Sequence, residues 1–150
     1  MLLRRHQTGY QDGNYSVVAG HLNGGEPVVC AAVREAREEV GITVAPEALE
    51  VVGVMHRLSD DERIDFFLVA SSWMGRIRNE EPEKCDQVAW FDVERLPQNV
   101  IPYVRRALEN SRKRQWDRAC RGGIWFDTFG WPEGRGQVSS SQGDSKLTGK

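Results

Sequence analysis

The chain is predicted to form a single α/β domain in which a mixed β-sheet lies between helices. Short segments rich in β-branched and aromatic residues alternate with two segments whose apolar residues recur every three or four positions. The first pattern is typical of strands, and the second is typical of helices that bury one face. A length of 150 residues allows one domain with a hydrophobic core and is too short for two ordinary domains.

The first two strands are expected on either side of a turn. Residues 1–5 end in two arginines and read as the second half of a strand, and residues 15–19 form the next apolar segment. Between them, residues 8–14 are dense in turn-forming types, including Asp12 followed by Gly13. Arg4 and Arg5 could attract phosphate groups, although a solvated strand end is the ordinary role for at least one of them.

A helix is predicted over residues 27–40. Pro27 suits the first helical position, and Gly41 suits the left-handed residue that follows the last turn. Apolar residues at intervals of three and four form one stripe that should face the core: Val29, Ala32, Val33, Ala36 and Val40.

Three glutamates of this helix lie outside the apolar stripe. Glu35, Glu38 and Glu39 are spaced i, i+3 and i+4, so their carboxylates lie on neighbouring turns and can converge. Like charges this close need either solvent screening on an open surface or a hard divalent cation between them. A solvated acidic face is the ordinary explanation of such a trio alone. The preceding glycine-bearing loop, which starts at Gly20, favours a binding site because its backbone can approach a ligand closely.

The rest of the chain supplies further strands and a second helix. Strands are predicted over residues 49–58 and 63–71, joined as an antiparallel hairpin by the polar turn 59–62. The charged stretch 76–86 contains Pro82 and is expected to be a loop, followed by a strand over residues 88–92. An amphipathic helix is predicted over residues 101–114, and the aromatic segment 122–131 should be ordered. Residues 132–150 are almost free of apolar side chains and should form a disordered tail.

Charge and cysteine content limit the classes of function. A net charge of −2 argues against a protein that holds nucleic acid polymers through their phosphates. Cys30, Cys85 and Cys120 are odd in number and lack the spacing of zinc ligands, so we read them as free thiols in a reducing, cytoplasmic compartment. No apolar run approaches the ~20 residues of a membrane span, so no membrane partner is expected. Homodimer formation is left open.

Residues 20–42 resemble the Nudix box of the Nudix hydrolases, G-x5-E-x7-R-E-U-x-E-E-x-G-U, in which U is bulky or apolar. All spacings are kept, and a chance match is expected on the order of 10⁻⁷ times in a chain of this length. The matching residues are Gly20, Glu26, Arg34, Glu35, Ala36, Glu38, Glu39, Gly41 and Ile42, of which Ala36 is smaller than the usual aliphatic residue.

The resemblance implies a fold and a set of metal ligands. The fold is the α/β/α sandwich of that family around a mixed sheet, spanning roughly residues 1–131. It also implies a strand before residue 1, so we expect the sheet to lack part of one edge. The cofactor would be Mg²⁺, with Mn²⁺ as the alternative. Glu38 and Glu39 would be the main metal ligands, with Glu35 as a third ligand or water-activating group and the carbonyl of Ala19 completing the site.

The resemblance also implies roles for the remaining polar residues. Arg34 would orient a glutamate of the trio, and Glu26 would hold the loop against the helix. Gly20 and Gly41 would be structural positions of the box. The general base would be Glu35, with Glu83 second and Glu80 and Glu81 as close rivals. Arg5 and Asn79 are candidates for substrate binding.

The implied reaction is hydrolysis of a nucleoside diphosphate linked to another group. Similarity to MutT-like members favours a (d)NTP, or an oxidised (d)NTP, that yields a monophosphate and pyrophosphate. Nucleotide sugars, NADH and dinucleoside polyphosphates are the alternative substrates. A Nudix module that senses a nucleotide without cleaving it is the alternative outside the enzymes, although the intact glutamate trio disfavours it.

Overall fold

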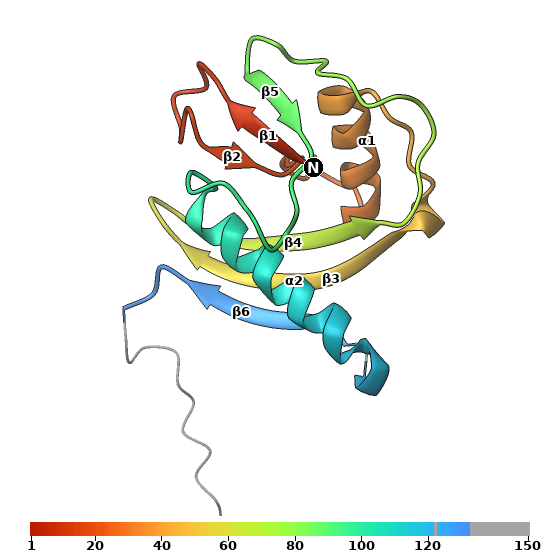
Figure 1. The fold of residues 1–150 in the computed structure, drawn as a ribbon, viewed down its shortest axis with the longest axis vertical. Helices are drawn as coiled ribbons and strands as arrows, with labels where there is room; N and C mark the ends of the chain where they lie inside the picture. The colour runs from red at the N-terminus through yellow and green to blue at the C-terminus, as the bar shows by residue number, and fades with distance from the viewer. Residues whose placement is uncertain (122, 133–150) are drawn as a thin grey trace, which may run out of the picture.

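The computed structural model describes residues 1–121 and 123–132, without the side chains of residues 114–121. Its strands form two three-stranded sheets (Figure 1). The first sheet has the order β2-β1-β5 and is antiparallel. The second has the order β4-β3-β6 and is mixed, because β3 pairs antiparallel with β4 and parallel with β6. The strands are β1 (Leu2–Arg5), β2 (Tyr15–Ser16), β3 (Leu49–Leu58), β4 (Glu62–Ala70), β5 (Cys85–Ala89) and β6 (Trp125–Phe129).

Two helices cover opposite faces of β1. Leu3 packs in one buried cluster with Ala36 and Val40 of α1 (Val28–Val40), whereas Leu2 packs in a second cluster with Val104 of α2 (Pro102–Arg121). Because successive residues of a strand point to opposite faces, α1 and α2 must lie on either side of this sheet. The fold is therefore an α/β/α sandwich, as the sequence predicts. A short 3-10 helix, η1 (Pro46–Ala48), precedes β3.

Several predicted elements differ from those observed at their ends. The predicted hairpin is confirmed, and β3 has the predicted bounds. β5 begins at Cys85, inside the segment predicted as a loop, because Cys85 pairs with Arg5 and Arg4 forms a bidentate ion pair with Asp86. β2 contains only two residues, and α2 continues to Arg121. β1 is hydrogen-bonded along both edges, to β2 and to β5.

The buried side of α1 also differs in part from the predicted stripe. Ala36 and Val40 are buried as expected, whereas Val29, Ala32 and Val33 are only partly covered. Ala31 is buried instead, so the helix is rotated about its axis relative to the predicted orientation.

None of the helices within the described part of the chain is both long and apolar enough to span a membrane. The predicted tail lies almost entirely outside the described residues, since only Pro132 of it is included.

Candidate active site

The ends of α1 place its glutamates at fixed positions. Pro27 occupies the N-cap with extended backbone angles, and Gly41 ends the helix in the left-handed conformation with a φ of 71°. The last carbonyls of the helix accept hydrogen bonds from the segment after β4: Arg78 N–H donates to Val40 O, and Glu80 N–H donates to Glu39 O. The segment after β4 is thereby fastened to the end of the helix that carries the glutamates.

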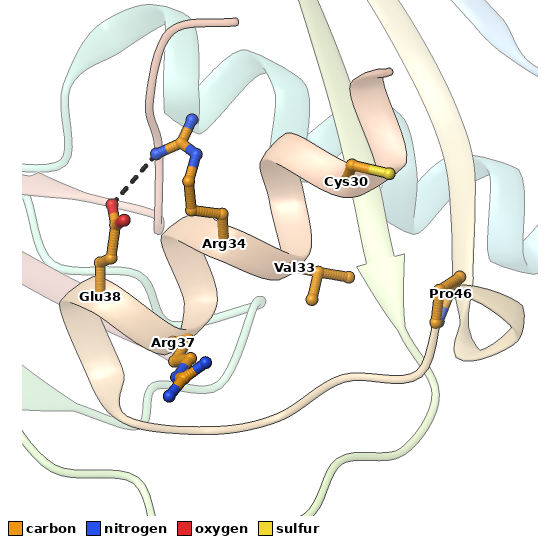
Figure 2. Close-up of a pocket in the computed structure, with 6 residues that line it drawn as sticks. All are labelled: Cys30, Val33, Arg34, Arg37, Glu38 and Pro46. Carbon is orange, nitrogen blue, oxygen red and sulfur yellow. Dashed lines mark hydrogen bonds and ion pairs between the residues drawn. The ribbon is translucent and has the colours of Figure 1, made fainter. Parts of the chain in front are cut away.

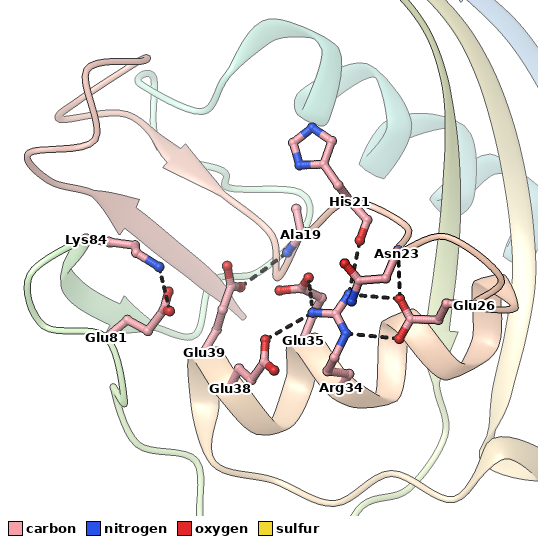
Figure 3. Close-up of polar contacts among 10 residues, drawn as sticks. All are labelled: Ala19, His21, Asn23, Glu26, Arg34, Glu35, Glu38, Glu39, Glu81 and Lys84. Atoms are coloured by element: carbon pink, nitrogen blue, oxygen red, sulfur yellow. Dashed lines mark hydrogen bonds and ion pairs between the residues drawn. The ribbon is translucent and has the colours of Figure 1, made fainter.

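Arg34 is the centre of the polar contacts at the site (Figure 3). Its guanidinium binds Glu26 in a bidentate manner, with Nε–Oε1 and Nη2–Oε2 distances of 2.9 and 3.0 Å. Nη1 donates to Glu35 Oε1 at 2.6 Å and to Glu38 Oε2 at 3.0 Å. Nη2 also donates to the His21 carbonyl at 3.0 Å. These bonds, that of Glu26 first, raise the pKa of Arg34 above its ordinary value, so Arg34 stays charged.

Gly20 lies against Glu35 so closely that no side chain fits between them. A Cβ atom at position 20 would stand 1.7 Å from Glu35 Oε1 and 1.9 Å from its Cδ. Because Gly20 has no side chain, the loop backbone can approach the carboxylate of Glu35.

Glu39 is partly buried and contacts the backbone of the loop before the helix. It accepts a hydrogen bond from Ala19 N–H at 3.2 Å, which places Ala19 next to this group. Burial, followed by the charges of Glu35 and Glu81, raises the pKa of Glu39 to about 7, against the lowering effect of the Ala19 bond. An ionised Glu39 is therefore costly in this environment unless a positive charge lies nearby.

These groups surround a cavity of about 440 Å³ between α1, β1 and the segment before β5. The trio of glutamates lines it together with Ala19, Gly20 and His21, and two cationic side chains, Arg5 and Lys84, face the same space. Arg5 is held in place by bonds from its guanidinium to the Tyr10 carbonyl and Thr8 Oγ1. Acidic and basic groups thus share one cavity. The basic groups suit a polyanionic ligand, and the acidic groups suit a cation that is bound together with it.

A larger hollow of about 630 Å³ lies on the outer side of α1, lined by Cys30, Val33, Arg34, Arg37, Glu38 and Pro46 (Figure 2). It contains only one carboxylate, and that carboxylate is already bound to Arg34. We therefore assign the chemistry to the smaller cavity, where the charged groups converge.

Two of the predicted site residues lie elsewhere. Glu83 is exposed and does not line the cavity, whereas its rival Glu81 does. The reason is a turn in which the N–H groups of Lys84 and Cys85 both donate to Glu81 O, which directs residue 83 away. Asn79 supports this loop instead of facing the cavity, because Nδ2 donates to Cys85 O at 2.6 Å and Oδ1 accepts from Glu81 N–H.

Sequence reasoning overlooked Lys84 and Thr8 as cavity residues. Lys84 lies in the charged loop that already supplied the glutamate candidates, and Thr8 lies in the predicted turn. Neither residue type nor spacing distinguishes them from solvated neighbours, so only the position of the loops could reveal them.

The donor set of the cavity fits a hard divalent cation. Its candidate ligands are carboxylate oxygens, which Mg²⁺ and similar ions prefer. Among the described side chains, those of residues 1–113 and 123–132, no three from His, Cys, Asp or Glu already converge as a formed metal site.

Comparison with known proteins agrees with this fold and site. The family model described as the NUDIX domain matches residues 1–119. The chain therefore belongs to the Nudix family, whose members hydrolyse pyrophosphate bonds and generally use divalent metal ions.

Within that family the chain is a MutT-like Nudix hydrolase. The crystal structure of a MutT NUDIX hydrolase from Burkholderia pseudomallei is similar to it, with a TM-score of 0.67 and 26% sequence identity. The similarity covers 73% of this chain and 84% of that one. The resemblance that the sequence predicts is confirmed.

Proposed function

We propose that this enzyme cleaves the pyrophosphate bond of a (d)NTP or an oxidised (d)NTP and releases a monophosphate and pyrophosphate. The observation that carries the proposal is the cavity in which Glu35, Glu38 and Glu39 face Arg5 and Lys84. Arg5 and Lys84 suit a chain of phosphates, and the carboxylates suit the metal that such a chain requires. The similarity to a MutT hydrolase favours a nucleoside triphosphate over a nucleotide sugar, NADH or a dinucleoside polyphosphate.

Mg²⁺ is the proposed cofactor, with Mn²⁺ as the alternative, and Glu38, Glu39 and Ala19 would hold it. A bound Mg²⁺ supplies positive charge that neutralises phosphate oxygens and the charge developing on the leaving group. Arg34 keeps Glu35 and Glu38 aimed at the cavity through bonds of 2.6 and 3.0 Å. Because burial raises the pKa of Glu39, a neighbouring cation would favour its ionised form.

Glu35 is the proposed general base. It would take a proton from the attacking water as the new P–O bond forms and the bridging P–O bond breaks, with the electron pair leaving on the bridging oxygen of the departing pyrophosphate or nucleoside monophosphate. Glu81 replaces Glu83 as the second candidate, because Glu81 lines the cavity and lies near Glu39. Arg5 would bind phosphate oxygens, since its position is already set by Thr8 and Tyr10.

The test is phosphate and pyrophosphate release from a panel of NTPs, oxidised dNTPs, nucleotide sugars, NADH and dinucleoside polyphosphates with Mg²⁺ or Mn²⁺. Glu38→Gln should abolish turnover and leave the fold intact. Glu47→Gln is the matched control, because it removes an exposed carboxylate outside the cavity. Failure to turn over any (d)NTP while another panel member is cleaved would refute the substrate, and full activity of Glu38→Gln would refute the ligand assignment.

A further inference from the structure

The beginning of β4 reaches the loop that precedes α1. Arg63 Nη1 lies 2.9 Å from Nε2 of His21, although 42 positions separate the two residues. Asp61 aims the guanidinium: Arg63 Nε donates to both of its carboxylate oxygens at 2.8 Å, and Nη2 donates to Oδ2 at 2.6 Å. Asp61 thus binds Nε and Nη2, and Nη1 points toward His21.

This contact determines which nitrogen of His21 carries the proton. An arginine can only donate hydrogen bonds, so Nε2 of His21 must be the acceptor. A neutral imidazole that accepts at Nε2 carries its proton on Nδ1. The contact therefore requires one particular tautomer as well as one ring orientation.

His21 links this contact to the carboxylates. Its ring is held by Arg63, while its backbone carbonyl accepts a hydrogen bond from Arg34 Nη2 at 3.0 Å. Arg34 in turn holds Glu35 at 2.6 Å and Glu38 at 3.0 Å. A displacement of His21 would shift one of the contacts that orient the Arg34 guanidinium, and with it the two carboxylates.

We propose that Arg63 is a positioning residue of the active site, which acts through His21 and Arg34 on the placement of Glu35 and Glu38. Arg63 is absent from the residues that line the cavity, whereas His21 lines it. The Arg63 and Asp61 side chains are 40% and 53% exposed, so their ion pair contributes little to stability. The ion pair between Arg63 and Asp61 instead orients the loop that contains His21. This inference rests on the hydrolase function proposed above.

The kinetic test compares Arg63→Ala with the unmodified enzyme on a substrate that the panel identifies. We expect kcat to fall about tenfold with little change in KM or Tm, because small misplacement of catalytic groups lowers the rate without loosening binding. Arg63→Lys should restore part of kcat, since lysine can still donate to His21. Arg112→Ala is the matched control: it removes an exposed arginine that pairs with Glu94 far from the cavity, and it should change nothing.

A double-mutant comparison separates positioning from direct substrate contact. In a His21→Ala background, Arg63→Ala should have no further effect on kcat, because the group through which it acts is gone. Additive losses, an unchanged kcat, or a rise in KM alone would each overturn the proposal. The last outcome would make Arg63 a substrate-binding residue instead.

A spectroscopic readout needs no substrate and so stands apart from the proposed function. Long-range ¹H–¹⁵N spectra should show the Nδ1–H tautomer of His21 in the unmodified protein and a mixture of tautomers in Arg63→Ala. The Arg34 Nε–H signal should shift in the same variant. Identical spectra in both proteins would refute the contact, whereas changed spectra with no turnover of any panel compound would refute only the function.

Discussion

Replacement of Gly20 by alanine tests the geometry of the site most directly. The added Cβ would lie 1.7 Å from Glu35 Oε1, so the carboxylate must move by about 1.5 Å or more to reach an ordinary contact distance. The 2.6 Å bond from Arg34 Nη1 to the same oxygen cannot survive that movement. A displacement of this size at a catalytic group lowers the rate on the order of 100-fold.

The fold should tolerate the same change. The clashing atoms belong to the end of a flexible side chain, and the backbone of Gly20 is not in the left-handed region. We expect a loss of only about 1 kcal/mol in the free energy of unfolding, at the lower end for overpacked sites. Catalysis and folding are therefore affected to very different extents.

The assay is kcat with the identified substrate, together with a thermal unfolding curve. Gly24→Ala is the matched control, because a Cβ at position 24 meets nothing within 4 Å and the residue lies in the same loop. The reasoning is refuted if Gly20→Ala keeps more than about a third of the activity of the Gly24→Ala control, since a 100-fold loss is expected.

Three further predictions follow from the structure. In metal-free protein the pKa of Glu39 is raised, so the folded state binds the carboxyl proton of Glu39 more tightly than the unfolded chain does. The free energy of unfolding should therefore fall by up to about 3 kcal/mol as pH rises from 4.5 to about 7. Unfolding curves of Glu39→Gln should lack this loss. Gly41→Ala should lower stability by about 1–2 kcal/mol, because residue 41 has a φ of 71° and its Cβ would lie 2.6 Å from Glu80 Oε1. Glu81→Gln should lower kcat, whereas Glu83→Gln should leave it unchanged, because only Glu81 lines the cavity.

Each of these predictions has an outcome that contradicts it. An equal slope of stability against pH in the unmodified protein and Glu39→Gln would show that Glu39 is not the titrating group. A Gly41→Ala variant as stable as the original would show that the helix end can adopt another cap. Loss of activity in Glu83→Gln with a normal Glu81→Gln would restore Glu83 as the loop residue of the site.

Local sequence signals predicted the elements whose ends depend on nearby residues. Gly41 ends α1 as predicted, because a left-handed backbone is a property of a single residue. The helix begins at Val28, one position later than predicted, with Pro27 as its N-cap. The bounds of β5 were wrong because a strand is defined by its partner: Cys85 joins the sheet through Arg5, which lies 80 positions earlier.

The same distinction applies to the site. The spacing of Glu35, Glu38 and Glu39 predicts that they share one side of a helix, and the structure places all three along one cavity. The choice between Glu81 and Glu83 could not be read from spacing, since it depends on a turn that points one carboxylate inward and the other to solvent. The contact of Arg63 with His21 likewise joins segments whose approach depends on how the sheets pack.

The α/β fold class followed from the sequence alone, because strand-like and helix-like patterns alternate along the chain, and membership of the Nudix family followed from the spacings within one helix and the loop before it. The tertiary structure decided which other residues accompany that chemistry. Arg5, Lys84 and Glu81 enter the cavity, and Asn79 and Glu83 stay out of it, because long-range strand pairing and loop turns set the direction of each side chain. Spacing along the chain governs contacts within one helix, but contacts between elements are governed by packing.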